Sequence, residues 1–182
     1  MMSRVLVYAA AFFFLFAAPA AAKEGFYLGA FLPTSTLSGD AGTGIDSGSG
    51  WGVRAGLGLN RYLSVEGNYA VTSHDLTGGS STDLTGLAAD LKLNFPLTSL
   101  DRGGVMTLEP YGLIGYKHYE SSKPSTAKSD GVEYGFGIEL YLFRELSVNA
   151  GWTRTKVTFK DSGPDTSGEV KTVDFGVIYH FL

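Results

Sequence analysis

The sequence predicts an all-β fold, an eight-stranded antiparallel up-and-down β-barrel that follows a cleaved signal peptide. Three observations predict this fold class. Apolar residues alternate with small or polar ones at period two from Gly25 onward, which is the side-chain period of a β-strand. The alternating segments number eight, and clusters of Gly, Ser, Asp and Pro separate them. Helical periodicity is absent after the first 22 residues.

The composition fits one domain and excludes several kinds of site. The length of 182 residues suits a single domain, and the 25 glycines follow no three-residue period, so collagen is a poor fit. The absence of Cys excludes a disulfide framework, a thiolate zinc site and a cysteine nucleophile. Because the formal net charge is -4 and no Lys/Arg stripe is present, nucleic acid is not an expected partner.

The N-terminal segment, residues 1–22, has the pattern of a secretory signal peptide. Arg4 precedes an apolar run from Val5 to Ala18, and the small residues Ala20–Ala22 follow Pro19. A transmembrane helix would need about 18 to 20 apolar residues, and this run ends before that length. The sequence therefore predicts an exported protein with a signal peptide at 1–22 and a barrel domain at 23–182. Loss of Arg4, the only charged residue of the segment, changes the formal net charge from -4 to -5.

The strand segments and their connections follow a regular order. The predicted strands are Glu24–Leu32, Gly50–Leu59, Tyr62–Ser73, Asp83–Phe95, Thr107–Glu120, Gly131–Phe143, Leu146–Phe159 and Glu169–Phe181. The even-numbered connections are Asn60–Arg61, Pro96–Met106 and Arg144–Glu145, of which two are two-residue hairpin turns. The odd-numbered connections are predicted polar loops, at Pro33–Ser49, His74–Thr82, Ser121–Asp130 and Lys160–Gly168. An even strand count with short turns at one end and loops at the other is typical of a barrel that spans an outer membrane.

The two faces of the strands differ in a way that distinguishes a membrane barrel from a soluble one. In the second strand, Trp51, Val53 and Leu57 share one face, and Gly52, Arg54 and Gly56 share the other. The third, fourth, sixth and eighth strands repeat this contrast between an uncharged apolar face and a face of charges and glycine. A soluble sandwich would carry solvated Lys and Glu rather than glycine on its polar face, so the charges are predicted to point into a narrow lumen. The predicted lumen charges are Arg54, Glu66, Asp90, Lys92, Glu109, Lys117, Glu139 and Asp174.

Outward aromatic residues form two groups that are typical of the girdles at the two membrane surfaces. With periplasmic termini, the inner girdle is predicted to contain Phe26, Phe95, Tyr179 and Phe181. The outer girdle is predicted to contain Trp51, Tyr69, Tyr116, Tyr134 and Trp152.

Four segments carry a resemblance to a known family: Gly25–Ala30, Pro110–Tyr116, Gly135–Glu139 and Val173–Phe181. With them, the chain resembles the eight-stranded outer-membrane β-barrels of Gram-negative bacteria, which include the transmembrane domain of OmpA and the opacity-type surface proteins. The resemblance implies outer-membrane lipid, lipopolysaccharide and an extracellular molecule as partners. It also implies that the barrel-assembly machinery reads the terminal aromatic residue, here Phe181, although Leu182 follows it in this chain.

The interior charges pose the main mechanistic question. An eight-stranded barrel has a lumen only wide enough for its own side chains, so opposite charges inside it are expected to pair and to exclude an open pore. We expect Arg54 and Lys92 each to pair with a carboxylate of a neighbouring strand, chiefly Glu66, Asp90, Glu109 or Glu139.

Catalytic, cofactor and metal sites are not predicted. The histidines are His74 at a loop edge, His118 near a loop rim and His180 at the periplasmic end, where we find no matched carboxylate. A lipid hydrolase built on His118 and Ser121 is disfavoured because a spacing of three does not put both side chains on one strand face. A calcium loop starting at Asp40 fails because Trp51 stands where its twelfth-position glutamate should be.

The function favoured by the sequence is that of a non-enzymatic integral outer-membrane protein, structural or surface-exposed, with adhesion or recognition through its four extracellular loops. One alternative is a narrow channel for small solutes or hydrophobic molecules, which would show a conductance sensitive to the charge of Arg54 or Lys92. The other is a soluble periplasmic barrel of the lipocalin type, which would have an apolar interior.

Overall fold

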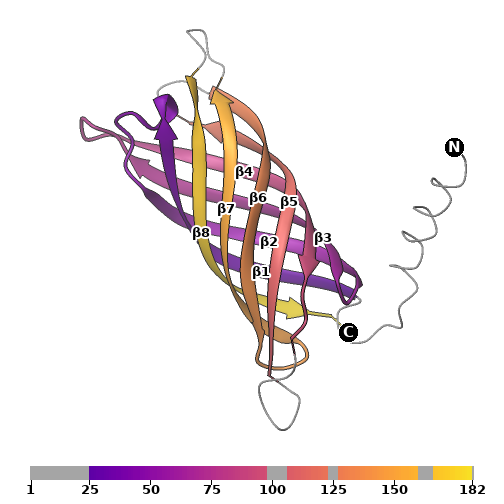
Figure 1. Ribbon diagram of the computed structural model, residues 1–182. Helices are drawn as coiled ribbons and strands as arrows, with labels where there is room; N and C mark the ends of the chain where they lie inside the picture. Colours follow the sequence, from indigo (N-terminus) through magenta and orange to yellow (C-terminus); the bar gives the residue numbers. More distant parts are fainter. Residues whose placement is uncertain (1–24, 98–105, 123–126, 160–165, 182) are drawn as a thin grey trace, which may run out of the picture.

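The computed structural model describes residues 25–97, 106–122, 127–159 and 166–181, and they form one closed barrel (Figure 1). Each strand is antiparallel to the next, and β8 pairs with β1 to close the barrel. The strands are β1 Gly25–Gly39, β2 Gly48–Asn60, β3 Leu63–Asp75, β4 Ser81–Asn94, β5 Thr107–Ser121, β6 Ala127–Tyr141, β7 Leu146–Phe159 and β8 Thr166–His180. The predicted fold class is confirmed. No helix in these residues is long and apolar enough to cross a bilayer. The predicted signal peptide and Glu24 lie outside the described residues.

One end of the barrel, here called the turn end, holds the β2–β3, β4–β5 and β6–β7 connections. The β2–β3 turn is fixed by Asn60, whose Oδ1 accepts hydrogen bonds from the backbone N–H groups of Tyr62 at 2.8 Å and Leu63 at 3.0 Å. Strands β4, β6 and β8 end one or two residues before the predicted positions, at Asn94, Tyr141 and His180. The opposite end, here called the loop end, holds the other connections.

The strands extend further toward the loop end than the sequence predicted. The predicted loop Pro33–Ser49 is wrong in its first part, because β1 continues to Gly39 and pairs with β8 from Tyr27 to Gly39. The other loops are also shorter than predicted, since β3 reaches Asp75, β5 reaches Ser121 and β8 begins at Thr166. The added residues of β1 carry Thr34, Thr36 and Ser38 on the outer face, so the apolar alternation that identifies a membrane strand stops before the strand does.

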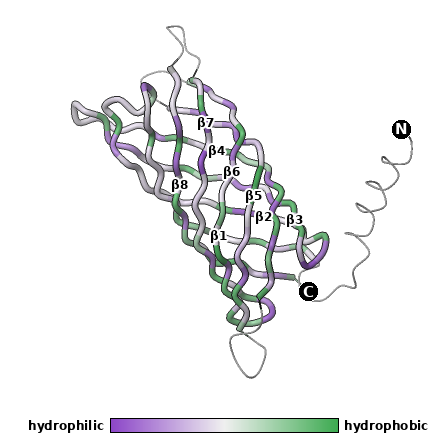
Figure 2. Tube along the Cα trace, in the orientation of Figure 1, coloured by the Kyte–Doolittle hydropathy of each residue, from purple (hydrophilic) through white to green (hydrophobic). Residues whose placement is uncertain are grey.

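The outer surface carries an apolar band that ends at a sharp boundary. Outward side chains such as Leu32, Phe136 and Phe175 are more than 60% exposed, and hydrophobic positions gather over the part of the barrel nearer the turn end in Figure 2. On every strand the last outward apolar residue is followed, toward the loop end, by a polar one. These eight boundary pairs are Leu32/Thr34, Trp51/Ser49, Val71/Ser73, Leu87/Thr85, Tyr116/His118, Val132/Asp130, Trp152/Arg154 and Val173/Lys171. We place the loop-end surface of the membrane at this boundary.

Beyond this boundary the interior of the barrel contains an apolar cluster beside buried polar residues such as Ser35 and His74. Side chains of β1, β4, β5, β7 and β8 meet in a buried cluster inside the loop end, and Ala41 of the short helix η1 (Asp40–Gly42) joins them. The members, here called the mouth cluster, are Leu37, Ala41, Leu84, Tyr119, Val157, Phe159 and Val170. The loop-end part of the barrel therefore combines a small apolar cluster inside with a polar exterior, which is closer to the pattern of a soluble barrel.

The β1–β2 and β3–β4 loops are joined to each other. Ile45 and Leu76 form a β-bridge, and the N–H of Thr77 donates to the carbonyl of Gly44 at 2.8 Å. Underneath, His74 Nδ1 donates to the carbonyl of Asp46 at 2.9 Å, while Nε2 lies 2.9 Å from Thr72 Oγ1. His74, which the sequence placed at a loop edge, lies in β3, and its side chain points inward and is 1% exposed. These contacts hold the two loops as one braced surface.

Candidate functional site

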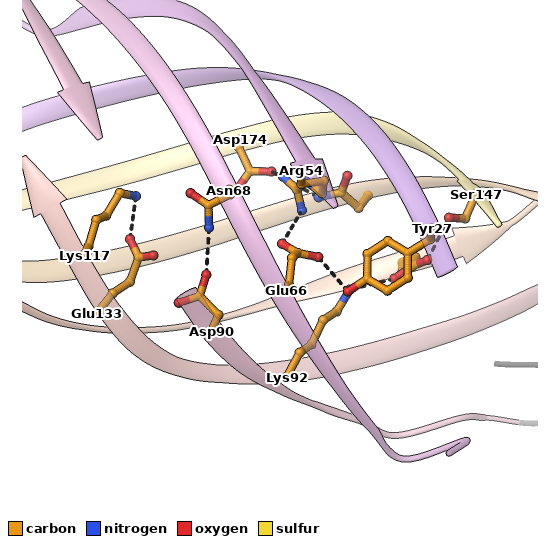
Figure 3. Close-up of polar contacts among 12 residues, drawn as sticks. Tyr27, Arg54, Glu66, Asn68, Asp90, Lys92, Lys117, Glu133, Ser147 and Asp174 are labelled. Atoms are coloured by element: carbon orange, nitrogen blue, oxygen red, sulfur yellow. Dashed lines mark hydrogen bonds and ion pairs between the residues drawn. The ribbon is translucent and has the colours of Figure 1, made fainter. Parts of the chain in front are cut away.

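The interior of the barrel contains the predicted charged residues. All eight occupy inward positions on β2, β3, β4, β5, β6 or β8, and all are buried. They fall into groups at different heights along the barrel, and Figure 3 labels six of the eight. These residues are Arg54, Glu66, Asp90, Lys92, Glu109, Lys117, Glu139 and Asp174.

The first group surrounds Arg54. Its Nη2 lies 2.6 Å from Asp174 Oδ1, and its Nη1 lies 3.6 Å from Glu66 Oε1. The hydroxyl of Tyr27 donates to Glu66 Oε2 at 2.9 Å (Figure 3), and Asn149 Nδ2 donates to Asp174 Oδ1 at 3.0 Å. Each carboxylate therefore has a neutral donor as well as the guanidinium, which is what a buried ion pair requires to offset its desolvation.

The second group lies nearer the turn end and is centred on Glu139. Its Oε2 accepts from Lys92 Nζ at 2.8 Å, and its Oε1 accepts from Ser147 Oγ at 2.7 Å. His180 Nε2 is 3.1 Å from the same Oε1. The prediction that His180 lacks a matched carboxylate is therefore wrong. The ammonium of Lys92 also lies 4.1 Å from the centre of the Tyr111 ring.

The third group lies toward the loop end. Lys117 Nζ is 2.7 Å from Glu133 Oε2 (Figure 3), and Glu133 is 1% exposed. Glu133 was not among the predicted lumen charges, although its place in the alternation of β6 puts it on the inner face. Asp90 accepts from Asn68 Nδ2 at 2.7 Å and, among the described residues, forms no ion pair. Glu109 lies opposite Glu139 in the β5–β6 register.

The space left between these side chains is small. A cavity of about 40 Å³ separates the Arg54 group from the Lys117 group, and one of about 10 Å³ lies beside Lys92 and His180. Such volumes hold a few water molecules at most. The mouth cluster covers the lumen on the loop side. In this conformation the lumen is filled along its length.

The predicted girdle residues lie on the outer face. Phe26, Phe95, Tyr179 and Phe181 lie at the turn end, and the rings of Phe26 and Phe181 are 5.6 Å apart. Toward the loop end are Trp51, Tyr69, Tyr116, Tyr134 and Trp152. Within that set the rings of Trp51 and Tyr69 are 6.0 Å apart, and Trp152 packs on Phe136 at 5.3 Å.

Two of the histidines contact carboxylates, His118 that of Asp130 and His180 that of Glu139. His118 Nδ1 is 2.7 Å from Asp130 Oδ1, whereas Ser121 Oγ is 3.2 Å from Thr82 Oγ1, so His118 and Ser121 do not form a pair. Ser147 Oγ is 3.0 Å from His180 Nε2 but donates its proton to Glu139, and Ser147 is fully buried. A nucleophile also needs a path for its substrate, and the fully buried Ser147 has none. Among the described residues no cluster of His, Asp and Glu could hold a metal ion.

Comparisons with known proteins agree on the architecture. Residues 8–181 match the family described as outer membrane protein beta-barrel domain. Among solved structures, Neisserial surface protein A aligns with a TM-score of 0.62 and 14% identity over 87% of this chain and 98% of its own. The attachment invasion locus protein Ail of Yersinia pestis aligns at 0.54 with 15% identity over 87% and 99%. OprG of Pseudomonas aeruginosa aligns at 0.55 with 17% identity over 88% and 98%. The search of curated proteins found no match.

Proposed function

We propose that this chain, which belongs to the family of outer membrane protein β-barrel domains, is a non-enzymatic surface protein. Its barrel would anchor a binding surface that its loops form. In this proposal residues 1–22 direct export and are removed. The strand that ends beside Phe181 would be the segment that the assembly machinery reads, and the Phe181 side chain is exposed at the turn end.

The observation that carries this proposal is the closure of the lumen at two levels. Ion pairs fill the membrane-level interior, and the mouth cluster fills the interior above it. A solute that entered would have to separate buried ion pairs and displace an apolar core, both of which are costly. The surface that remains available to molecules outside the cell is the loop end.

The form of the loop end also supports recognition. The strands extend past the membrane boundary, which raises the loops above the lipid surface, and the bridge between Ile45 and Leu76 holds two of the loops together. Preorganised surfaces lose less conformational entropy on binding than mobile loops do. Ail, which shares the fold, is an attachment invasion protein, and its structure has also been determined with the heparin analogue sucrose octasulfate.

Attachment of whole cells tests this function. Gram-negative cells that express the chain are expected to bind cultured epithelial cells and immobilised heparin more than cells without it. Replacing Thr43, Ile45, Asp46 and Thr77 by Gly or Ser should abolish the gain, because this removes the larger side chains of the braced loops but not the barrel. A matched control exchanges the turn-end residues Arg144 and Glu145 for Asn and Gly and should keep the gain.

Two results would contradict the proposal. One is equal attachment by the loop-replaced variant when the amount of heat-modifiable protein in the outer membrane is unchanged. The other is stepwise conductance in planar bilayers that reverses its ion selectivity with Arg54→Glu, which would favour the channel alternative.

A further inference from the structure

The first ring of outward residues above the apolar band has an uneven distribution of charge. On β1 to β4 these positions hold only Ser or Thr, and on β5 and β6 they hold His118 and Asp130. Among the described residues of this ring the permanent cations are Arg154 on β7 and Lys171 on β8, which are adjacent strands. Positive charge at the loop-end membrane surface is therefore concentrated at one side of the barrel.

Arg154 and Lys171 are directly opposite each other in the β7–β8 register. Like charges in a cross-strand pair repel, so this arrangement costs stability unless an anion lies between them. In the next row Lys156 lies opposite Glu169, and Glu169 forms an ion pair with Arg154. Three cations thus share one carboxylate, which leaves an excess of two positive charges on this patch. Lys156 and Lys171 are exposed, and Arg154 is partly exposed.

The position of the patch indicates what anion it meets. Trp152 and Val173, the last apolar residues of the band on β7 and β8, form the cross-strand pair immediately below Arg154 and Lys171. The aliphatic stems of Arg and Lys can lie over such apolar residues while their charged ends reach the headgroup layer. Guanidinium binds phosphate through two parallel hydrogen bonds, and ammonium supports it as a point charge.

Strands β5 and β6 differ at this height, because their positive and negative side chains are equal in number. On β5 and β6 the exposed Lys128 pairs with Glu120 at 2.6 Å, and His118 pairs with Asp130 at 2.7 Å. Carboxylates there match or exceed the cations, so that side has no excess positive charge to offer a phosphate. The contrast provides a control residue, Lys128, of the same type and exposure as Lys156.

We propose that Arg154, Lys156 and Lys171 form a binding site for the phosphate groups of an anionic lipid headgroup in the outer leaflet, of the phosphorylated glycolipid class to which lipopolysaccharide belongs. This inference rests on the proposed outer-membrane location and names a lipid partner for the barrel. The site would fix the barrel's depth and rotation relative to the lipid around it and would leave the braced loops free for other partners.

Titration with lipid A in nanodiscs tests the site. The mature chain with Trp51→Phe keeps one of its two tryptophans, Trp152, whose fluorescence reports binding beside the patch. The chain in phosphatidylcholine nanodiscs is expected to bind bisphosphorylated lipid A more tightly than dephosphorylated lipid A. Arg154→Gln with Lys171→Gln should weaken binding about 25-fold, from about fivefold for each charge removed. Lys128→Gln should leave it unchanged.

Each other result is informative. Equal affinity of the double variant and the parent chain for lipid A would overturn the site. A fluorescence change with inorganic phosphate in lipid A-free discs, lost in the double variant, would show a site for free phosphate and overturn the lipid assignment. Boiling-dependent gel mobility checks that the variants fold. If the double variant does not fold, the single variants Lys171→Gln and Lys156→Gln are titrated with lipid A instead. Because no cell attachment is measured, failure of this site is distinguishable from failure of the proposed function.

Discussion

Lys92→Met is expected to lower the free energy of unfolding by about 3 to 5 kcal/mol, because it leaves Glu139 charged and buried without its cation. Lys92 and Glu139 are 2.8 Å apart, and each side chain is less than 5% exposed. Ser147 and His180 contact the other oxygen of Glu139 and cannot reach the position of the lost ammonium without leaving it. Urea titration of the barrel in lipid vesicles, followed by tryptophan fluorescence, measures the change.

Two variants serve as controls for this result. Lys92→Met combined with Glu139→Gln removes both charges and should recover most of the lost stability, because neither ion of this pair is left without its partner. Lys128→Met breaks the exposed pair with Glu120 and should change stability far less, since water and salt screen both charges. Equal effects of Lys92→Met and Lys128→Met would contradict a closed, ion-paired lumen.

Gly56→Ala is expected to destabilise the barrel by about 3 kcal/mol. A Cβ atom at Gly56 would lie 2.2 Å from the ring of Tyr27, which faces Gly56 across the β1–β2 pair. The ring cannot turn away freely, because its hydroxyl donates to Glu66 and the ring of His180 lies 5.5 Å from it. The expected cost combines the overpacking of the lumen with the loss of a hydrogen bond to a charged group. The same urea titration applies.

The matched control is Gly67→Ala on β3. A Cβ atom at Gly67 would point out of the barrel, and its nearest neighbours are 3.8 and 3.9 Å away. This substitution should leave stability unchanged or raise it slightly, because alanine loses less conformational freedom on folding than glycine does. If Gly56→Ala changes the free energy of unfolding as little as Gly67→Ala does, the close contact between Tyr27 and the β2 backbone does not restrict the lumen.

The strand faces could be predicted because lipid inverts the usual pattern of a soluble protein. In β2, for example, Trp51 and Val53 alternate with Gly52 and Arg54. A face that combines charge with glycine is typical of the interior of a membrane barrel rather than of the solvated face of a sandwich. Strand number, order and inward or outward direction all follow from this alternation. The ends of the strands do not, because Thr34 and Thr36 pair as regularly as Leu28 does but give no apolar signal.

The mouth cluster was not predicted for a related physical reason. Above the membrane the rule reverses, so inward apolar residues such as Leu37 and Val170 alternate with outward polar ones. In the sequence this reversal appears as an alternation that changes phase within a strand. The segment after such a change of phase is short. Because it does not continue the pattern of the membrane-spanning part, it is predicted to be a loop.

Partner choice inside the lumen depends on register and on reach across the barrel. Lys92 of β4 pairs with Glu139 of β6, and Arg54 of β2 pairs with Asp174 of β8, although neither pair lies on adjacent strands. The expectation that partners come from neighbouring strands is thus right for Arg54 with Glu66 but wrong for these two pairs. Long side chains span a narrow lumen, and sequence spacing alone does not give the height of each residue along the axis.

The measurement that tests the account most directly is the labelling of single cysteines in intact cells with a membrane-impermeant maleimide. Because the chain has no Cys, each introduced thiol reports one position. Ser80→Cys in the β3–β4 loop should label on intact cells, and Arg144→Cys at the turn end should label only after the outer membrane is opened. Labelling of Arg144→Cys on intact cells, or recovery of the protein in the salt-soluble fraction without detergent, would contradict an outer-membrane barrel that presents its loops to the outside.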